Sequence, residues 1–169
     1  MSHNLRNNSG WQSKSRDKLL IGLLTLLIGS LIYIVDRPPE QIYFIDSGGF
    51  PISLNGRITN IFGSIGNNLP GFIHVFSFSL MTSAVIGDNK FRDSIICMSW
   101  FVVDVTAELF QKFNSWTVII PDWFKGIPYI ENTKSYFHNG TFDTLDLVAI
   151  GVGSISAIGV LHYMRKRSR

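Results

Sequence analysis

The stretch FVVDVTAELFQKF, residues 101–113, is apolar enough to lie in a bilayer, and yet it contains Asp104, Glu108 and Gln111. At 100° per residue, these three side chains and Trp100 fall within about 60° of one direction on a helix. An ionisable group deep in a membrane span costs about 2.5 to 3.5 kcal/mol on insertion scales, so such groups normally face the interior of a helix bundle. The stretch therefore predicts a membrane helix whose single polar face is turned toward other helices.

The composition of the whole chain agrees with a membrane protein. Of its 169 residues, 46% are hydrophobic and only 16% are charged, whereas about a quarter are charged in an ordinary soluble domain. Four apolar windows approach the length of about 20 residues that a helix needs to cross a bilayer: residues 19–35, 72–87, 94–113 and 145–164. We therefore predict an all-α membrane protein, with four transmembrane helices bundled into one domain over residues 19–164.

The basic residues predict an orientation for this bundle. Ten of the 15 Lys and Arg residues lie in the tail 1–18, in the short connection around Lys90, and in the tail 165–169. Cytoplasmic segments are enriched in Lys and Arg, so we expect both termini inside. The first span lacks a small-x-small cleavage site after it, which favours a retained helix over a signal peptide. The basic residues flank membrane spans, so we expect lipid as the partner and no nucleic acid.

Two longer segments are expected on the outer side. Residues 53–69 carry apolar side chains at helical spacing behind a capping Ser53, which predicts an interfacial helix. Residues 116–142 are rich in Trp, Tyr and Phe and are interrupted by Pro and Gly. Such aromatic side chains favour the membrane–water boundary, so we expect a long aromatic outer loop that lies along the headgroups over the bundle.

Polar residues of three predicted spans should meet near the outer surface. His74 lies in the first turn of the second span, and Asp143 and Asp146 lie where the fourth span enters the membrane. Asp146 shares a face with Ala149 and Gly153, whose small side chains allow another helix to approach closely. The simplest interpretation is that these polar residues line one pocket under the outer surface. The candidate ligand-binding residues are His74, Asp104, Glu108, Gln111, Asp143 and Asp146.

Three short motifs resemble the VanZ-like family, small bacterial membrane proteins named for a teicoplanin-resistance member: HVFSFSL from residue 74, ELFQ from residue 108, and GTFDTLDLVAIGVG from residue 140. The resemblance covers about residues 70–163 and the first span. It implies a protein of the bacterial cytoplasmic membrane with a role in the cell envelope, and it does not imply a reaction. It also implies that five of the candidate residues match the family's polar positions: His74, Glu108, Gln111, Asp143 and Asp146.

The chain also departs from that family's pattern. Pro70 stands where an acidic residue usually precedes the histidine by four positions, and Ile150 stands where an asparagine usually follows the last aspartate by four. The Pro-Gly-Arg that usually lies near the Glu-x-x-Gln is replaced by an aromatic insertion. If that arginine binds an anion in the family, this chain lacks the contact.

Each candidate residue also has a simpler explanation. Asp143 can be the N-cap of the last span, and Asp146 can favour its helix dipole. Glu108 and Gln111 can serve as interhelical hydrogen-bonding groups, and His74 can be an interfacial histidine or a partner of Glu108. A protonated Asp104 can donate to a backbone carbonyl.

Three functions therefore stay open at the level of sequence. The first is an envelope protein that binds an amphiphile or a membrane partner in the polar pocket. The second is a membrane-embedded hydrolase or transferase with His74, Glu108 and Asp146 as catalytic candidates. The third is a structural or assembly subunit. The single cysteine, Cys97, excludes an intramolecular disulfide and a multi-thiolate metal site. No residue spacing predicts a metal site, and the sequence leaves the cofactor unknown.

Overall fold

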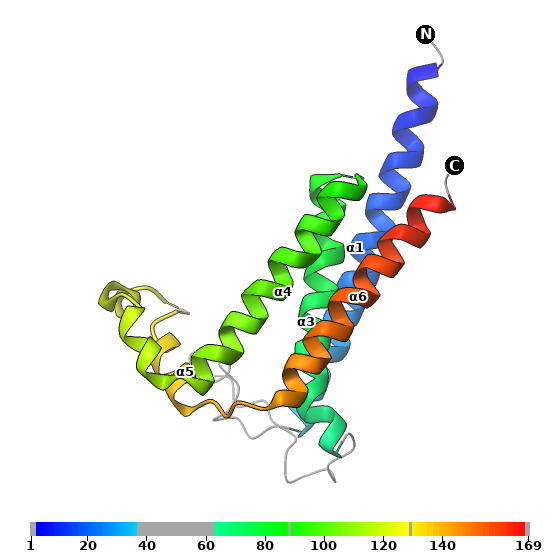
Figure 1. Ribbon diagram of the computed structural model, residues 1–169. Coiled ribbons are helices and arrows are strands. Elements are labelled where there is room, and N and C mark those ends of the chain that lie inside the picture. Colours follow the sequence, from blue (N-terminus) through cyan, green and yellow to red (C-terminus); the bar gives the residue numbers. More distant parts are fainter. Residues whose placement is uncertain (1–2, 37–62, 88, 129, 168–169) are drawn as a thin grey trace.

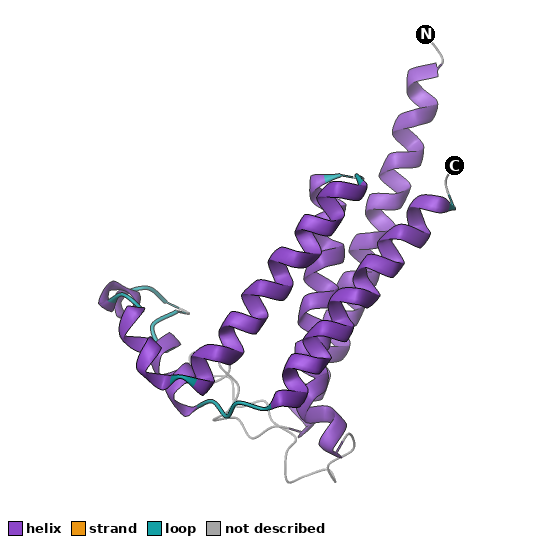
Figure 2. Ribbon diagram, viewed as in Figure 1, coloured by secondary structure: helices purple, strands orange, loops and turns teal. Residues whose placement is uncertain are grey.

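The computed structural model describes residues 3–36, 63–87, 89–128 and 130–167, and over these residues it contains helices and loops but no strand (Figures 1 and 2). Four long helices pack together: α1 (His3–Asp36), α3 (Gly63–Ile86), α4 (Lys90–Lys112) and α6 (Thr144–Lys166). Three short helices join α4 to α6: η2 (Asn114–Ile119), η3 (Asp122–Gly126) and α5 (Thr133–Asn139). The predicted all-helical bundle is confirmed at this level.

The bundle has two chemically different ends. The first half of α1, the turn between α3 and α4, and the last turn of α6 lie at one end, which we call the basic end (Figure 1). The segment between α4 and α6, residues 113–143, lies at the opposite end, which we call the loop end (Figure 1). Helices α3 and α6 therefore run in one direction, and α1 and α4 run in the other.

The turn between α3 and α4 is short because local residues allow it. Gly87 adopts a φ of 100°, a left-handed conformation that costs glycine little. Asn89 then caps α4, and its side-chain oxygen accepts hydrogen bonds from the backbone N–H groups of Phe91 at 2.9 Å and Arg92 at 3.4 Å. Such a short connection makes the two helices antiparallel neighbours.

Helix α3 is the centre of the bundle, since it packs against α1, α4 and α6. Glycines on α1 and α6 allow close approach to it. A Cβ atom at Gly22 of α1 would lie 2.7 Å from Met81 Cγ, and one at Gly153 of α6 would lie 2.6 Å from the carbonyl oxygen of Phe72. The close approach expected at the small residues of the last span is thus present at Gly153, consistent with how membrane helices pack.

Apolar side chains fill the middle of the bundle and also cover much of its outside. The buried core cluster consists of Phe76, Leu80, Cys97, Ala157 and Leu161. Leu24, Leu27 and Leu31 of α1 are about 60% exposed. A continuous exposed apolar surface of this kind is unusual for a soluble monomer and suits a lipid environment.

Two helical segments of the described chain are long and apolar enough to cross a membrane. They are Asn68–Ile86, with a mean hydropathy of 1.6, and Thr144–Lys166, with 1.9. These correspond to the second and fourth predicted spans. Spans in α1 and α4 stay predictions.

The helices extend beyond the predicted spans. Helix α1 begins at His3 rather than near residue 19, and its first turns project beyond the other helices (Figure 1). Helix α3 begins at Gly63 and continues through Pro70. The last residues of the expected interfacial helix, 63–69, are thus part of α3, while residues 53–62 lie outside the described part of the chain.

The aromatic segment extends from the loop end of α4 (Figure 1). Its expected position along the headgroups stays a prediction. Helices η2 and α5 pack against each other and against the end of α4 (Figure 1). Phe110 of α4 contacts the ring of Trp116 at 5.9 Å and the ring of Phe137 at 5.3 Å. These aromatic contacts hold the segment to α4, because each ring pair buries a large apolar area.

An ion-pair cluster also orders this segment. Lys134 donates to a carboxylate oxygen of Asp122 at 2.8 Å, and Lys125 lies 3.4 Å from the same oxygen. The hydrogen bond from Lys134, followed by that from Lys125, lowers the pKa of Asp122 from its ordinary value of 3.8. The three side chains are mainly solvent-facing, so this cluster contributes little to stability.

Candidate functional site

The central feature of the candidate site is a pair of residues from two different helices, His74 of α3 and Asp104 of α4. Nδ1 of His74 lies 2.8 Å from each carboxylate oxygen of Asp104. The Asp104 side chain is only 9% exposed, whereas the His74 side chain is 45% exposed. A buried carboxylate thus holds an imidazole that is open to its surroundings.

This geometry determines which nitrogen of His74 can meet a ligand. An ionised carboxylate only accepts hydrogen bonds, so Nδ1 of His74 is the donor in this pair. Among the described residues, His74 makes no further hydrogen bond. Nε2 therefore keeps its capacity to accept a proton or to bind a polar group. Orientation of an imidazole by a carboxylate on the opposite nitrogen is the arrangement that also supports general acid–base chemistry.

Two aromatic side chains hold the imidazole from the side. The His74 ring meets Phe78 edge-to-face at 4.4 Å and Trp100 at 5.9 Å, and Phe78 stacks on Trp100 at 4.8 Å. Trp100 is itself fixed, because its indole N–H donates to Thr82 Oγ1 at 3.0 Å. Apolar rings beside a polar imidazole make an amphipathic surface between α3 and α4.

A second polar cluster lies nearer the loop end, between α3 and α6. The amide nitrogen of Asn68 donates to Asp146 at 3.1 Å and to Asp143 at 3.4 Å. Asp143 also caps α6 by accepting a hydrogen bond from the backbone N–H of Leu145 at 2.9 Å. The capping role anticipated for Asp143 is therefore present. Asn68 was not singled out from the sequence, although it lies six residues before His74.

Glu108 and Gln111 follow Asp104 along α4 toward the loop end. One carboxylate oxygen of Glu108 is buried. The side chain of Gln111 lies against Gly140, where a Cβ atom would be only 2.6 Å from the amide carbon of Gln111. Gln111 thus packs against the chain that leads into α6.

The contacts divide the six candidate residues into separate groups. The structure brings His74 together with Asp104, and it brings Asp143 together with Asp146 through Asn68. Glu108 lies one helical turn beyond Asp104, in the direction in which α3 reaches Asn68. We predicted that Glu108 and Asp146 meet His74 in a single pocket, and this stays a prediction.

Two positions noted in the sequence, Pro70 and Ile150, are buried in the structure. Pro70 lies within α3, and Ile150 is 1% exposed. A Cβ atom at Gly71 would lie 3.2 Å from Ile150 Cγ1. Ile150 therefore belongs to an apolar contact between α3 and α6 at Gly71.

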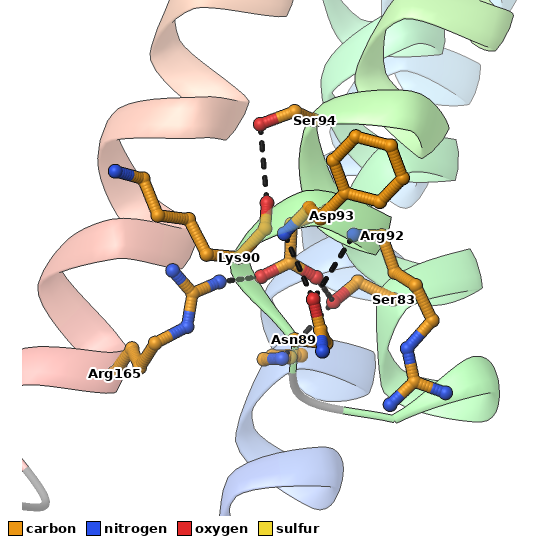
Figure 3. A network of polar contacts seen from close by, with 9 residues as sticks. Ser83, Asn89, Lys90, Arg92, Asp93, Ser94 and Arg165 are labelled. Atoms are coloured by element: carbon orange, nitrogen blue, oxygen red, sulfur yellow. Dashed lines mark hydrogen bonds and ion pairs between the residues drawn. The ribbon is translucent and has the colours of Figure 1, made fainter.

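A third polar group, at the basic end, was missed by the sequence analysis. We call it the Asp93 network. Ser83 and Arg165 contact the carboxylate of Asp93 (Figure 3), and Lys18 donates to Ser83. Asp93 precedes Asp104 by eleven residues and lies on the same side of α4, since both side chains are buried. The sequence signal was present in the spacing of Asp93, Cys97, Trp100 and Asp104, but residues 88–93 were interpreted only as a basic connection.

Within the described ranges, no group of three or more His, Cys, Asp and Glu side chains is arranged to hold a metal ion. Comparison of the chain with family models, curated proteins and solved structures gave no match.

Proposed function

We propose that this chain is a VanZ-like protein of the bacterial cytoplasmic membrane that binds the polar head group of an amphiphile at His74. The observation that carries the proposal is the His74–Asp104 pair: a buried carboxylate fixes an imidazole that is nearly half exposed. Interhelical pairs that only stabilise a bundle are normally buried on both sides.

The surroundings of His74 suit an amphiphile better than a freely soluble ligand. The rings of Phe78 and Trp100 flank the imidazole on the α3–α4 face, so an acyl chain or lipid glycerol region would contact aromatic carbon while the head group meets Nε2. Ligand sites are commonly apolar surfaces with a few fixed polar groups. The polar residues nearer the loop end, Asn68, Glu108 and Asp146, would extend the hydrogen-bonding surface for a larger head group.

We further propose four membrane spans with both termini in the cytoplasm, which places the loop end and His74 toward the outer leaflet. The concentration of Lys and Arg at the basic end supports this orientation. The candidate partners are therefore membrane lipids, or another membrane protein that presents a comparable polar group.

A membrane-embedded hydrolase or transferase is the second candidate, and one specific observation favours it. Because Asp104 holds Nδ1 of His74, Nε2 is oriented as a general base. In that case Glu108 and Asp146 would stabilise charge or position the substrate. Glu108→Gln would then fold normally and lose function, and His74→Gln would cause the same loss, since members of one catalytic unit fail together.

Native mass spectrometry of the purified protein tests head-group binding. After reconstitution with phosphatidylethanolamine and phosphatidylglycerol and release from detergent, we expect wild type to retain lipid and His74→Gln to retain severalfold less. Gln can still hydrogen-bond to Asp104, so the variant should fold. His162→Gln, at an exposed histidine of α6, is the matched control and should retain as much lipid as wild type. Equal retention in all three proteins would refute binding at His74.

A further inference from the structure

We infer that the group which His74 binds is a primary ammonium, as in the head group of an ethanolamine lipid, and that this ammonium donates a hydrogen bond to Nε2 of the imidazole. The inference rests on the proposed binding at His74 and adds the charge and the donor of the ligand. Three features of the site carry it: the hydrogen bond that fixes the imidazole, the charge of the His74–Asp104 pair, and the aromatic rings beside the pair.

The hydrogen bond to Asp104 makes Nε2 of His74 the acceptor of the site. Nδ1 lies 2.8 Å from each carboxylate oxygen of Asp104 and donates to that carboxylate. A neutral imidazole has one donor nitrogen and one acceptor nitrogen, so Nε2 is left to accept. A ligand that completes this arrangement must donate. An ammonium N–H does so, whereas a phosphodiester oxygen can only accept.

The charge of the pair gives an anion no attraction. An ionised Asp104 beside a neutral His74 gives the pair one negative charge, and beside an imidazolium it gives the pair no net charge. The Asp104 side chain is only 9% exposed, so solvent screens its charge less than that of a surface carboxylate. A cation is therefore attracted in the first state, and an anion is attracted in neither.

The two helices that form the site supply no cation near it. Helix α3 contains no Lys or Arg, and α4 contains none between Arg92 and Lys112. Arg92 donates to the carbonyl oxygen of Ile86 at the basic end, and Nζ of Lys112 lies 4.6 Å from the centre of the Phe142 ring. An anionic head group at His74 would thus find no countercharge on α3 or on the adjacent part of α4.

The aromatic rings beside His74 also favour a cation. The ring centres of Phe78 and Trp100 lie 4.4 Å and 5.9 Å from that of His74, and both side chains are partly exposed. The face of an aromatic ring carries partial negative charge, which attracts an ammonium group and not a phosphate. The hydrogen-bond acceptor, the charge and the rings therefore all select the same kind of head group.

Competition between lipids of different head groups tests this inference. The full-length protein would be reconstituted with equal amounts of phosphatidylethanolamine, phosphatidylglycerol and phosphatidylcholine with identical acyl chains, and native mass spectrometry would measure the lipid that each protein retains. The difference between wild type and His74→Gln gives the retention that depends on His74. We expect severalfold more of the ethanolamine lipid than of the anionic glycerol lipid or of the choline lipid, whose cation has no N–H to donate.

Variants of the pair and of the rings test the cause of the preference. Asp104→Asn keeps an acceptor for Nδ1 of His74 but makes the pair neutral or positive, so the preference for ethanolamine over glycerol lipid should be lost. Asp122→Asn, at an exposed acid of η3, is the matched control and should keep the wild-type ratio. Phe78→Leu should lower the ratio, whereas Phe91→Leu, at a 74% exposed ring of α4, should not.

Free ethanolamine added in excess distinguishes the source of the ammonium. Displacement of the lipid would identify a soluble amine as sufficient, and retention would identify the lipid as the ligand; either result supports an ammonium at His74.

The outcomes separate this inference from the binding on which it rests. Equal retention of ethanolamine and glycerol lipids at His74, or a wild-type ratio in a folded Asp104→Asn, would overturn the preference for a cation and leave head-group binding in place. Equal retention of ethanolamine and choline lipids would overturn donation to Nε2. Equal retention of every lipid by wild type and His74→Gln would instead refute the proposed binding itself.

Discussion

At the scale of single residues, two buried carboxylates of α4 have different surroundings and hence different roles. Asp93 accepts hydrogen bonds from two other helices on both oxygens. Among the described residues, the polar partner of Asp104 is the imidazole of His74, and that imidazole is itself partly exposed. Both carboxylate oxygens of Asp93 thus accept hydrogen bonds from the protein. The imidazole that Asp104 holds is still accessible to a ligand. This contrast is why we assign ligand binding to His74, whereas Asp93 connects α4 to α3 and α6 through hydrogen bonds.

The pairing of His74 with Asp104 predicts a measurable coupling energy. In a double-mutant cycle with His74→Ala and Asp104→Ala, we expect a coupling of about 0.5 to 2 kcal/mol, the range found for interhelical hydrogen bonds in membranes. Reversible unfolding in mixed micelles measures it. His74→Ala with Thr106→Ala is the control cycle, because Thr106 is exposed and bonds only to its own helix at Val102; its coupling should stay below about 0.5 kcal/mol. Equal coupling in both cycles would show that His74 and Asp104 are energetically independent.

The sequence identified the polar face of α4 but not the partner of each residue on it. Helical periodicity gives the direction of a side chain around its helix, which is why Asp104, Glu108 and Gln111 were grouped correctly. It does not give the axial offset between two helices. His74 was expected beside Glu108. The register of α3 against α4 places its Nδ1 at Asp104, one turn before Glu108 on α4, and its meeting with Glu108 stays a prediction.

At the scale of helices, small residues set how closely α3 and α6 approach. The carbonyl oxygen of Phe72 occupies the space that a side chain at Gly153 would need. The spacing of Ala149, Gly153 and Ala157 predicted such a contact, and Ala157 is fully buried. The α3–α6 contact also positions Asn68 against Asp146, so the polar cluster near the loop end depends on it.

Gly153→Ala should consequently destabilise the bundle. The added methyl group would meet backbone rather than a flexible side chain, and overpacking of this kind costs about 1 to 3 kcal/mol. Gly151→Ala is the matched control, because in the described part of the chain no packing neighbour outside its own stretch of helix lies within 4 Å of a Cβ atom at Gly151, and it should be neutral or slightly stabilising. Thermal unfolding in detergent compares the two variants. A stability loss in Gly151→Ala as large as that in Gly153→Ala would contradict the close α3–α6 contact.

At the scale of the whole molecule, composition and hydropathy predicted a helical bundle and its long helices. They could not predict where the aromatic segment would lie, because its aromatic side chains suit both a headgroup layer and a protein surface. In the structure Phe110 of α4 provides that surface. Helix α1 also continues well before its apolar part, through residues 3–18, which contain Gly10 but no proline.

The proposed orientation predicts a labelling pattern in whole cells. In a Cys97→Ser background, a cysteine at Trp123 should react with a membrane-impermeant thiol reagent from outside, because Trp123 is exposed at the loop end. A cysteine at Lys90, exposed at the basic end, should react only after the cells are opened. The reverse pattern would place His74 toward the cytoplasmic leaflet.

Photo-crosslinking in a bilayer tests most directly whether an amphiphile binds at His74. The protein would be reconstituted with phosphatidylethanolamine that carries a diazirine near its head group, irradiated, and mapped by peptide mass spectrometry. We expect an adduct on the peptides of α3 and α4 that contain Phe78 and Trp100, lost in His74→Gln and kept in His162→Gln. Adducts confined to outward faces, such as those of Leu24 and Ile155, with equal yields in all three proteins would contradict the proposed site.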